Sequence, residues 1–129
     1  LKHLLFLSSL TALLLGCVQV KGPYYLETGQ YQEGIESLEA AQKADPNDPS
    51  TAYYLGRYYL RLDEPASALP HLQKAVNLDG ADADYHFWLG VACWGVKQYD
   101  QEIAHYKKAI ALNQYHSSAH LYLGHGYLD

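Results

Sequence analysis

The sequence predicts an all-α protein, built as an α-solenoid of stacked helix-turn-helix hairpins. A Leu-Gly pair recurs at residues 55–56, 89–90 and 123–124, which is a period of 34 residues. Periods of this length are typical of repeat proteins. Within each period, large apolar residues recur at three- and four-residue spacing, as expected for amphipathic helices. The 129 residues, 49% hydrophobic and 18% charged, fit one globular domain.

Small and large residues occupy fixed columns of the 34-residue alignment. An alanine column and a column of leucine or tyrosine stand three residues apart, with members Ala41, Ala75, Ala109 and Leu38, Leu72, Tyr106. Glycine and alanine let two helix backbones approach closely, and the larger side chains fill the space beside them. Each hairpin is expected to stack on the next because it cannot bury its apolar face alone.

The pattern resembles the tetratricopeptide repeat (TPR). In that family the first helix carries a large residue, then Leu-Gly, then Tyr, and the second carries a small residue, an aromatic residue or Leu, and then Ala. The match is close in YYLGRYYLRLDEPASALPHLQKAVNLD and HFWLGVACWGVKQYDQEIAHYKKAIALN, and it extends over about residues 23–129. The resemblance implies a right-handed superhelix that acts as a non-catalytic scaffold for protein–protein interaction.

One residue departs from the family pattern. Glu102 occupies the column that holds Gly34 and Ala68, where the family has a small residue. We expect a local shift that lets the carboxylate of Glu102 reach water. The alternative is a buried, functional acid.

The array is expected to contain a partial repeat, two full repeats and a truncated repeat, at residues 23–48, 49–82, 83–116 and 117–129. In the partial repeat, residues 24–28 supply only the last turn or two of a helix, and Gly29 opens the turn. Residues 31–44 form the second helix, which is closed by the turn sequence Asp-Pro-Asn-Asp-Pro at 45–49.

The second repeat predicts a helix from residue 49 to about residue 62 and a partner helix over residues 65–78. Pro65 stands at the start of the partner helix, where proline is well tolerated. Pro70 is expected to fall within about the first turn of that helix, where fewer backbone hydrogen bonds are lost.

The third repeat predicts helices over residues 83–96 and 99–112, and the fourth begins at residue 117 and stops at residue 129. A terminal helix of a solenoid normally has a polar outer face. This helix still presents the apolar residues Leu121, Leu123, Tyr127 and Leu128. Together with Leu1 in place of an initiator Met, it suggests a fragment of a longer protein.

The N-terminal segment is expected to be an export signal over residues 1–16. Lys2 is followed by an apolar run of about a dozen residues, too short for a comfortable membrane span. The sequence Leu-Leu-Gly-Cys at 14–17 resembles a bacterial lipobox, which implies cleavage after Gly16 and lipidation of Cys17. An ordinary secretory signal, or a buried apolar helix with a chance cysteine, is the alternative.

Lipidation of Cys17 would anchor the array close to a membrane. Two or three acyl chains hold a protein firmly on a bilayer. The residue after Cys17 is Val18 and not an aspartate. By resemblance to bacterial lipoproteins, this favours the outer membrane and a periplasmic location. Residues 17–22 then form a tether that keeps the array within about 20 Å of the surface. Cys93 is left without a partner for a disulfide within the chain and is expected to be a buried, inert thiol.

The resemblance to TPR proteins places the first helix of each repeat along a concave groove that binds a protein or peptide partner. The residues that it assigns to this groove are Tyr53, Arg57, Leu60, Arg61, Phe87, Val91, Trp94, Gly95, Leu121, His125 and Leu128. The Lys and Asn clamp of chaperone-docking members is absent, since these columns hold Tyr53, Arg57 and Val91. An apolar trough with two arginines suits a segment with aromatic anchors and an acidic group. The alternative is that several of these rings only pack against neighbouring hairpins.

Other kinds of site have little support in the sequence. A net charge of −5 argues against nucleic-acid binding. Repetition explains the spacing of His86 with His120 and of His71 with His105, so no metal site or cofactor is expected, although His116, His120 and His125 lie close together. No phosphate-binding loop, nucleophile elbow or HExxH motif is present, and we expect no enzyme activity.

The sequence therefore predicts a TPR scaffold of the bacterial cell envelope, held by a lipid on Cys17. A second hypothesis is an envelope lipoprotein that binds glycan or peptidoglycan, because tyrosine and tryptophan with arginine also suit sugar rings. A third is the TPR part of a larger protein that has a catalytic domain beyond residue 129.

Overall fold

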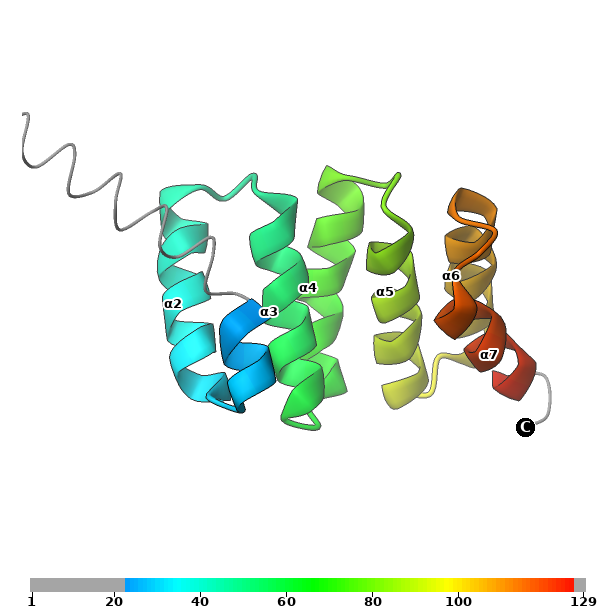
Figure 1. Cartoon of the computed structure of the whole chain (residues 1–129), viewed down its shortest axis with the longest axis horizontal. Coiled ribbons are helices and arrows are strands. Elements are labelled where there is room, and N and C mark those ends of the chain that lie inside the picture. Colours follow the sequence, from blue (N-terminus) through cyan, green and yellow to red (C-terminus); the bar gives the residue numbers. More distant parts are fainter. Residues whose placement is uncertain (1–22, 127–129) are drawn as a thin grey trace, which may run out of the picture.

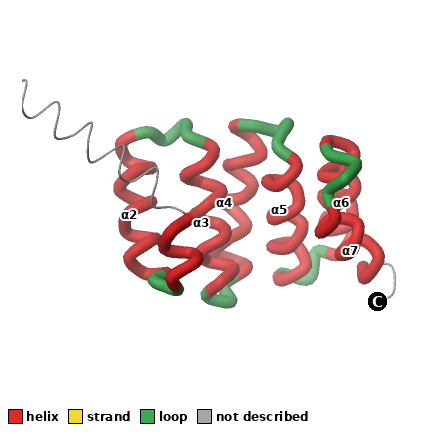
Figure 2. Tube along the Cα trace, viewed as in Figure 1, coloured by secondary structure: helices red, strands yellow, loops and turns green. Residues whose placement is uncertain are grey.

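The computed structural model describes residues 23–126, and all regular elements in this range are helices (Figures 1 and 2). A short helical segment at residues 23–28 is followed by six helices, which are α2 (Tyr31–Ala44), α3 (Pro49–Arg61), α4 (Pro65–Leu78), α5 (Ala83–Gly95), α6 (Tyr99–Leu112) and α7 (Ser117–Gly126). These bounds confirm the predicted helices. The predicted signal, Cys17, the tether and the residues after 126 lie outside the described range.

The helices follow one another along the long axis of the molecule (Figure 1). Each packs on the next one in the chain, and α3 also contacts α5. This arrangement of neighbour-to-neighbour contacts is that of a solenoid and confirms the predicted fold class. No helix within residues 23–126 combines the length and the apolar character that crossing a membrane requires.

Glycines allow the two helices of a hairpin to pack closely. A Cβ atom on Gly56 of α3 would lie 2.3 Å from Cγ of Leu72 on α4. On Gly90 of α5 it would lie 2.5 Å from Cε1 of Tyr106 on α6. Leu72 and Tyr106 are fully buried, and so they fill the space that each Leu-Gly pair leaves open. The predicted role of these columns is confirmed.

The core is divided into clusters that join successive hairpins. One cluster, around Leu55 and Tyr58, joins α2 and α3. A second, around Leu72 and Leu89, joins α3, α4 and α5. A third joins α5, α6 and α7 and contains Phe87. Within residues 23–126, no single cluster joins all the helices, because each hairpin buries its apolar face against its neighbour.

The turns within the hairpins share a position with positive φ. Gly29, Asp63 and Lys97 stand 34 residues apart, and each has a positive φ, of 76°, 60° and 62°. Asp48 and Asp82 begin α3 and α5 by accepting backbone N–H groups of the first turn. Pro70 lies in the second turn of α4, which is later than predicted, and Pro70 is exposed to solvent.

Candidate partner-binding groove

A groove runs along the face formed by α3, α5 and α7. It contains three adjoining hollows. The central hollow, of about 410 Å³, is lined by Arg57, Leu60, Arg61, Asp63, Pro65, Trp88, Val91, Trp94, Gly95 and Tyr122. The tyrosine hollow, of about 380 Å³, is lined by Ser50, Tyr53, Tyr54, Arg57, Asp82, Asp84 and Tyr85. The terminal hollow, of about 270 Å³, is lined by Val91, Trp94, Glu102, Tyr122, His125 and Gly126.

Arg57 lies where the central and tyrosine hollows meet. One of its terminal NH groups donates a hydrogen bond of 3.2 Å to the hydroxyl of Tyr53. The guanidinium carbon lies 4.5 Å from the centre of the Trp88 ring, a cation–π contact. The Nε atom is buried and has no hydrogen-bond partner among the described residues. The two rings therefore hold the positive charge in the middle of the groove.

Trp94 is the most prominent aromatic side chain of the groove. It is 57% exposed and borders both the central and the terminal hollow. Arg61, also exposed, lines the central hollow with it. Tyr122, 45% exposed, approaches from α7. Large exposed aromatic rings beside arginine are the residue types that most often dominate binding energy at protein interfaces.

Some of the residues that the sequence assigns to the groove line one of the three hollows in the structure, and others do not. Arg57, Leu60, Arg61, Val91, Trp94 and Gly95 all line the central hollow. Tyr53 borders the tyrosine hollow and His125 the terminal hollow. Leu121 is 59% exposed but borders none of the three hollows. Leu128 lies outside the described residues.

Phe87 corrects the sequence assignment, because its ring is only 5% exposed. It packs against the rings of Tyr106, His116 and Tyr122, at centroid distances of 5.7, 5.0 and 5.3 Å. Phe87 thus belongs to the core between α5 and α7. The next residue, Trp88, lies in the groove in its place.

Trp88 and Tyr122 were missed by the sequence assignment. A signal for them was present, since Tyr54, Trp88 and Tyr122 stand 34 residues apart and form an aromatic column. All three line the groove in the structure. The column lies next to the one that contains Phe87, and so an error of one position exchanges a core ring for a groove ring.

Glu102 is buried, contrary to the prediction that its carboxylate reaches water. It is 4% exposed, and a Cβ atom on Gly126 of α7 would lie 3.7 Å from its Oε1 atom. The end of α7 therefore covers the carboxylate from the solvent. Burial first, and then the charge of Glu102, raise the pKa of the Tyr106 phenol above its ordinary value.

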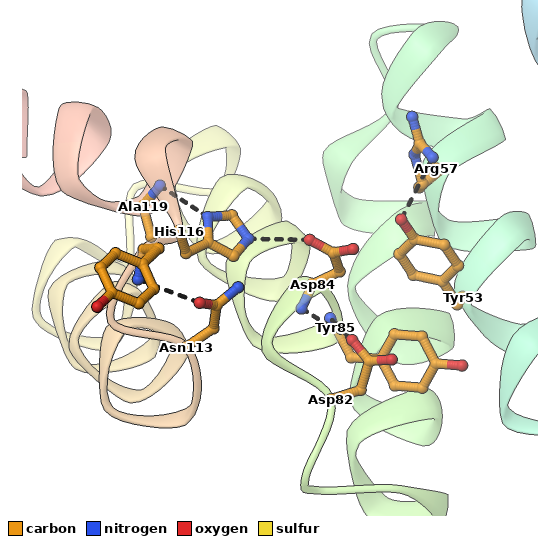
Figure 3. A network of polar contacts seen from close by, with 9 residues as sticks. Tyr53, Arg57, Asp82, Asp84, Tyr85, Asn113, His116 and Ala119 are labelled. Atoms are coloured by element: carbon orange, nitrogen blue, oxygen red, sulfur yellow. Dashed lines mark hydrogen bonds and ion pairs between the residues drawn. The ribbon is translucent and has the colours of Figure 1, made fainter.

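Polar contacts of histidine side chains join α5 to α6 and to the start of α7. His116 donates from Nε2 to Asp84 Oδ1 over 2.9 Å, and its Nδ1 atom accepts the N–H of Ala119 in the first turn of α7 (Figure 3). His86 and His105 approach each other through their Nδ1 atoms at 3.4 Å. These contacts give the histidines structural roles.

Sites for a metal or a reactive thiol find no support in the part of the chain that the structure describes. Within residues 23–126, no group of three or more His, Cys, Asp and Glu side chains is placed to hold a metal ion. Cys93 is fully buried, as predicted. Burial, and then the charge of Glu102, raise the pKa of its thiol to about 11, which keeps the thiol protonated and unreactive at neutral pH.

Comparison with known proteins identifies a repeat family. A family model described as "Tetratricopeptide repeat" matches residues 20–83 and 55–117. A search of curated proteins gave no match. Among solved structures, the first TPR domain of Spaghetti (RPAP3), bound to an HSP90 peptide SRMEEVD, has a TM-score of 0.84 at 22% identity. That likeness covers 88% of this chain and 90% of the other, and it shows the fold alone.

Two structures of MamA are also similar. One, from Desulfovibrio magneticus RS-1, has a TM-score of 0.82 and 26% identity over 88% of this chain and 64% of that chain. The other has a TM-score of 0.80 and 29% identity over 88% of this chain and 62% of that chain. The chain thus spans less than two thirds of the length of either MamA chain.

Proposed function

Because the chain belongs to the tetratricopeptide repeat family, we propose that it is a non-catalytic scaffold whose groove holds a segment of another protein. The observation that carries this proposal is the central hollow. There, the exposed ring of Trp94 lies beside Arg61, and Arg57 is fixed over Trp88. Such a surface binds a partner by burying an aromatic or apolar anchor between the tryptophans.

The arginines define the polar part of the partner. Guanidinium groups bind carboxylates by charge-assisted, often bidentate hydrogen bonds. We therefore expect an acidic side chain next to the apolar anchor. The HSP90 peptide in the RPAP3 structure is also acidic, but Tyr53 and Val91 replace the Lys and Asn of the chaperone-docking clamp. A different acidic segment is the expected ligand here.

The location of this scaffold is proposed to be the bacterial cell envelope, on the outer membrane and facing the periplasm. The support is the Leu-Leu-Gly-Cys sequence at 14–17, after an apolar run. Labelling with an alkyne fatty acid in a bacterial host should mark the protein with Cys17 and leave Cys17→Ser unmarked. Equal labelling of both forms would disprove the lipid anchor.

The groove is tested by partner capture. Protein beginning at residue 22 is used to retain proteins from envelope extract, which are identified by mass. We expect Arg57→Ala and Trp94→Ala each to reduce capture about tenfold or more, since truncation of such residues at interfaces often costs 2 kcal/mol or more. Tyr115→Ala is the matched control, because Tyr115 is 83% exposed and lines none of the three hollows.

Helix content, measured by circular dichroism, should be the same in all three variants. Capture that persists in both groove variants would show that another face binds the partner.

Titration with peptidoglycan fragments tests the second candidate, which is glycan binding. The exposed rings of Trp94 and Tyr122 favour this candidate, because sugar rings stack on such surfaces. Binding of glycan without any bound protein would replace the scaffold proposal.

A further inference from the structure

We propose that the groove selects a segment with both charges, in which a lysine or arginine side chain enters the tyrosine hollow about four residues from the acidic group. This inference rests on the proposed function and adds the basic residue and its spacing. The tyrosine hollow is formed by the first turns of α3 and α5, and it meets the central hollow at Arg57.

Two carboxylates are placed to receive a cation there. Asp82 Oδ1 accepts the backbone N–H groups of Asp84 and Tyr85, at 2.8 and 3.3 Å. Asp84 Oδ1 accepts from Nε2 of His116, and the Asp84 side chain is 64% exposed. The second oxygen of each carboxylate accepts no hydrogen bond from the described residues. Both oxygens therefore remain available to an incoming N–H donor.

Figure 3 shows the position of these carboxylates relative to the tyrosines. Asp84 lies in the first turn of α5, Asp82 caps that helix, and Tyr53 faces them from α3. The Tyr53 ring lies 4.8 Å from that of Tyr85 and 5.0 Å from that of Tyr54, measured between ring centres. Tyr53 and Tyr85 are each only 8% exposed, so the half-buried ring of Tyr54 is the aromatic surface that a cation in this hollow reaches. An ammonium or guanidinium group beside that ring and the carboxylates gains cation–π and ion-pair contacts together.

The electrostatic field agrees with this polarity. Burial raises the pKa of Tyr85 to about 12, and the charges of Asp82, Asp79 and Asp48 act in the same direction. Burial also raises the pKa of Tyr53 to about 12, where Arg57 acts to lower it and Asp84 to raise it. The sign of the local charge thus changes across the Tyr53 ring. The tyrosine hollow is the acidic end of the groove, and Arg57 and Arg61 form the basic end.

The spacing of the two charges follows from the helix. Tyr53 and Arg61 are separated by eight residues of α3, which is about 12 Å at 1.5 Å per residue. An extended peptide advances about 3.3 Å per residue. A segment that follows α3 therefore places its basic and acidic residues about four positions apart. Arg57 is the cationic side chain that lines the tyrosine hollow, and it already contacts Tyr53. His116 contacts Asp84 but does not line this hollow.

A peptide array tests this inference. The probes are synthetic heptapeptides that carry one tryptophan next to one glutamate, with either lysine or glutamine four residues from the glutamate, in both chain directions. We expect the lysine peptides to bind the purified protein roughly tenfold more tightly, from one cation–π contact and one ion pair. Asp84→Asn and Asp82→Asn should each reduce this preference, and the double variant should remove it.

The variants keep the local structure, because asparagine retains the Oδ1 atom. At position 82 this atom caps α5, and at position 84 it accepts the hydrogen bond from His116. Asp100→Asn, an exposed carboxylate of α6, is the matched control and should leave the preference unchanged. Equal binding of lysine and glutamine peptides would overturn the inference and leave the proposed function standing. Absence of binding by every peptide would overturn both.

Discussion

Single glycines set the distance between the helices of each hairpin. Gly90→Ala is expected to lower the free energy of unfolding by about 1–3 kcal/mol, the usual cost of overpacking. The added Cβ would lie 2.5 Å from the ring of Tyr106, which is fully buried, and 3.3 Å from the backbone oxygen of Glu102. Urea denaturation followed by circular dichroism measures the change.

Gly124 is the matched control for this substitution. It occupies the same column as Gly90, but a Cβ atom there would have no neighbour within 4 Å among the described residues. Gly124→Ala should leave stability unchanged or raise it by up to about 1 kcal/mol, the difference in helix propensity. Equal destabilisation by both substitutions would mean that close packing is not the cause.

The imidazole of His105 makes stability depend on pH. Burial, and then the charge of His86, lower the pKa of His105 from its ordinary 6.5. The folded protein thus binds this proton less tightly than the unfolded chain does. The contribution to stability is present above pH 6.5 and is lost as the pH falls below 6.5 toward the folded pKa.

We expect the urea midpoint to fall between pH 8 and pH 5, and to fall less in His105→Gln. His120→Gln, at an exposed position, is the control and should show the wild-type dependence. A midpoint that falls equally in all three proteins would assign the effect to other groups. His71 is one such group, because burial lowers its pKa as well.

Some site residues were predictable from the sequence one by one, and others were not. That Arg57 and Trp94 line the central hollow was predictable, because the resemblance to TPR proteins assigns their positions in α3 and α5 to the groove. Phe87 was assigned to the groove in place of Trp88, because α5 is apolar on nearly all sides. A helix of that kind shows no polar face from which its orientation can be inferred. Only the contact of Phe87 with α7 separates the two rings.

At the level of the element, the turns were less predictable than the helices. The starts of the helices were predictable because aspartate caps and prolines mark where helices begin. The predicted ends of α3 and α5 lie one residue beyond the observed ends. The positive φ at Lys97 had no signal in the sequence, because lysine does not indicate it, and aspartate at position 63 is only a weak indicator. Only Gly29, in the same column, has the residue that such a turn normally requires.

Lys97→Gly is expected to stabilise the protein by about 1 kcal/mol. A residue with a Cβ atom is strained in the left-handed region by roughly 1–2 kcal/mol, and glycine removes that strain but increases the entropy of the unfolded chain. The midpoint of urea denaturation should rise. Lys108→Gly, at an exposed position inside α6, is the control and should destabilise by about 1 kcal/mol, the cost of glycine within a helix. The opposite order would exclude backbone strain at Lys97.

For the whole molecule, a solenoid with divided cores is expected to open from its ends. Stability in such arrays is approximately the sum of each repeat and its contacts with the neighbours. Amides of α3, α4, α5 and α6, which have packed helices on both sides, should exchange with deuterium most slowly. Those of α7 should exchange faster, because Leu121 and Tyr122 are exposed. Uniform protection by mass spectrometry would indicate one cooperative unit instead.

The placement of the two tryptophans has a practical consequence. The sequence contains no others, and Trp88 and Trp94 both border the central hollow. Trp88 lies under a guanidinium group, whereas Trp94 faces the solvent. A ligand that removes water from Trp94 should shift its emission to shorter wavelength, and so the protein carries its own fluorescent reporter of occupancy, without any attached dye.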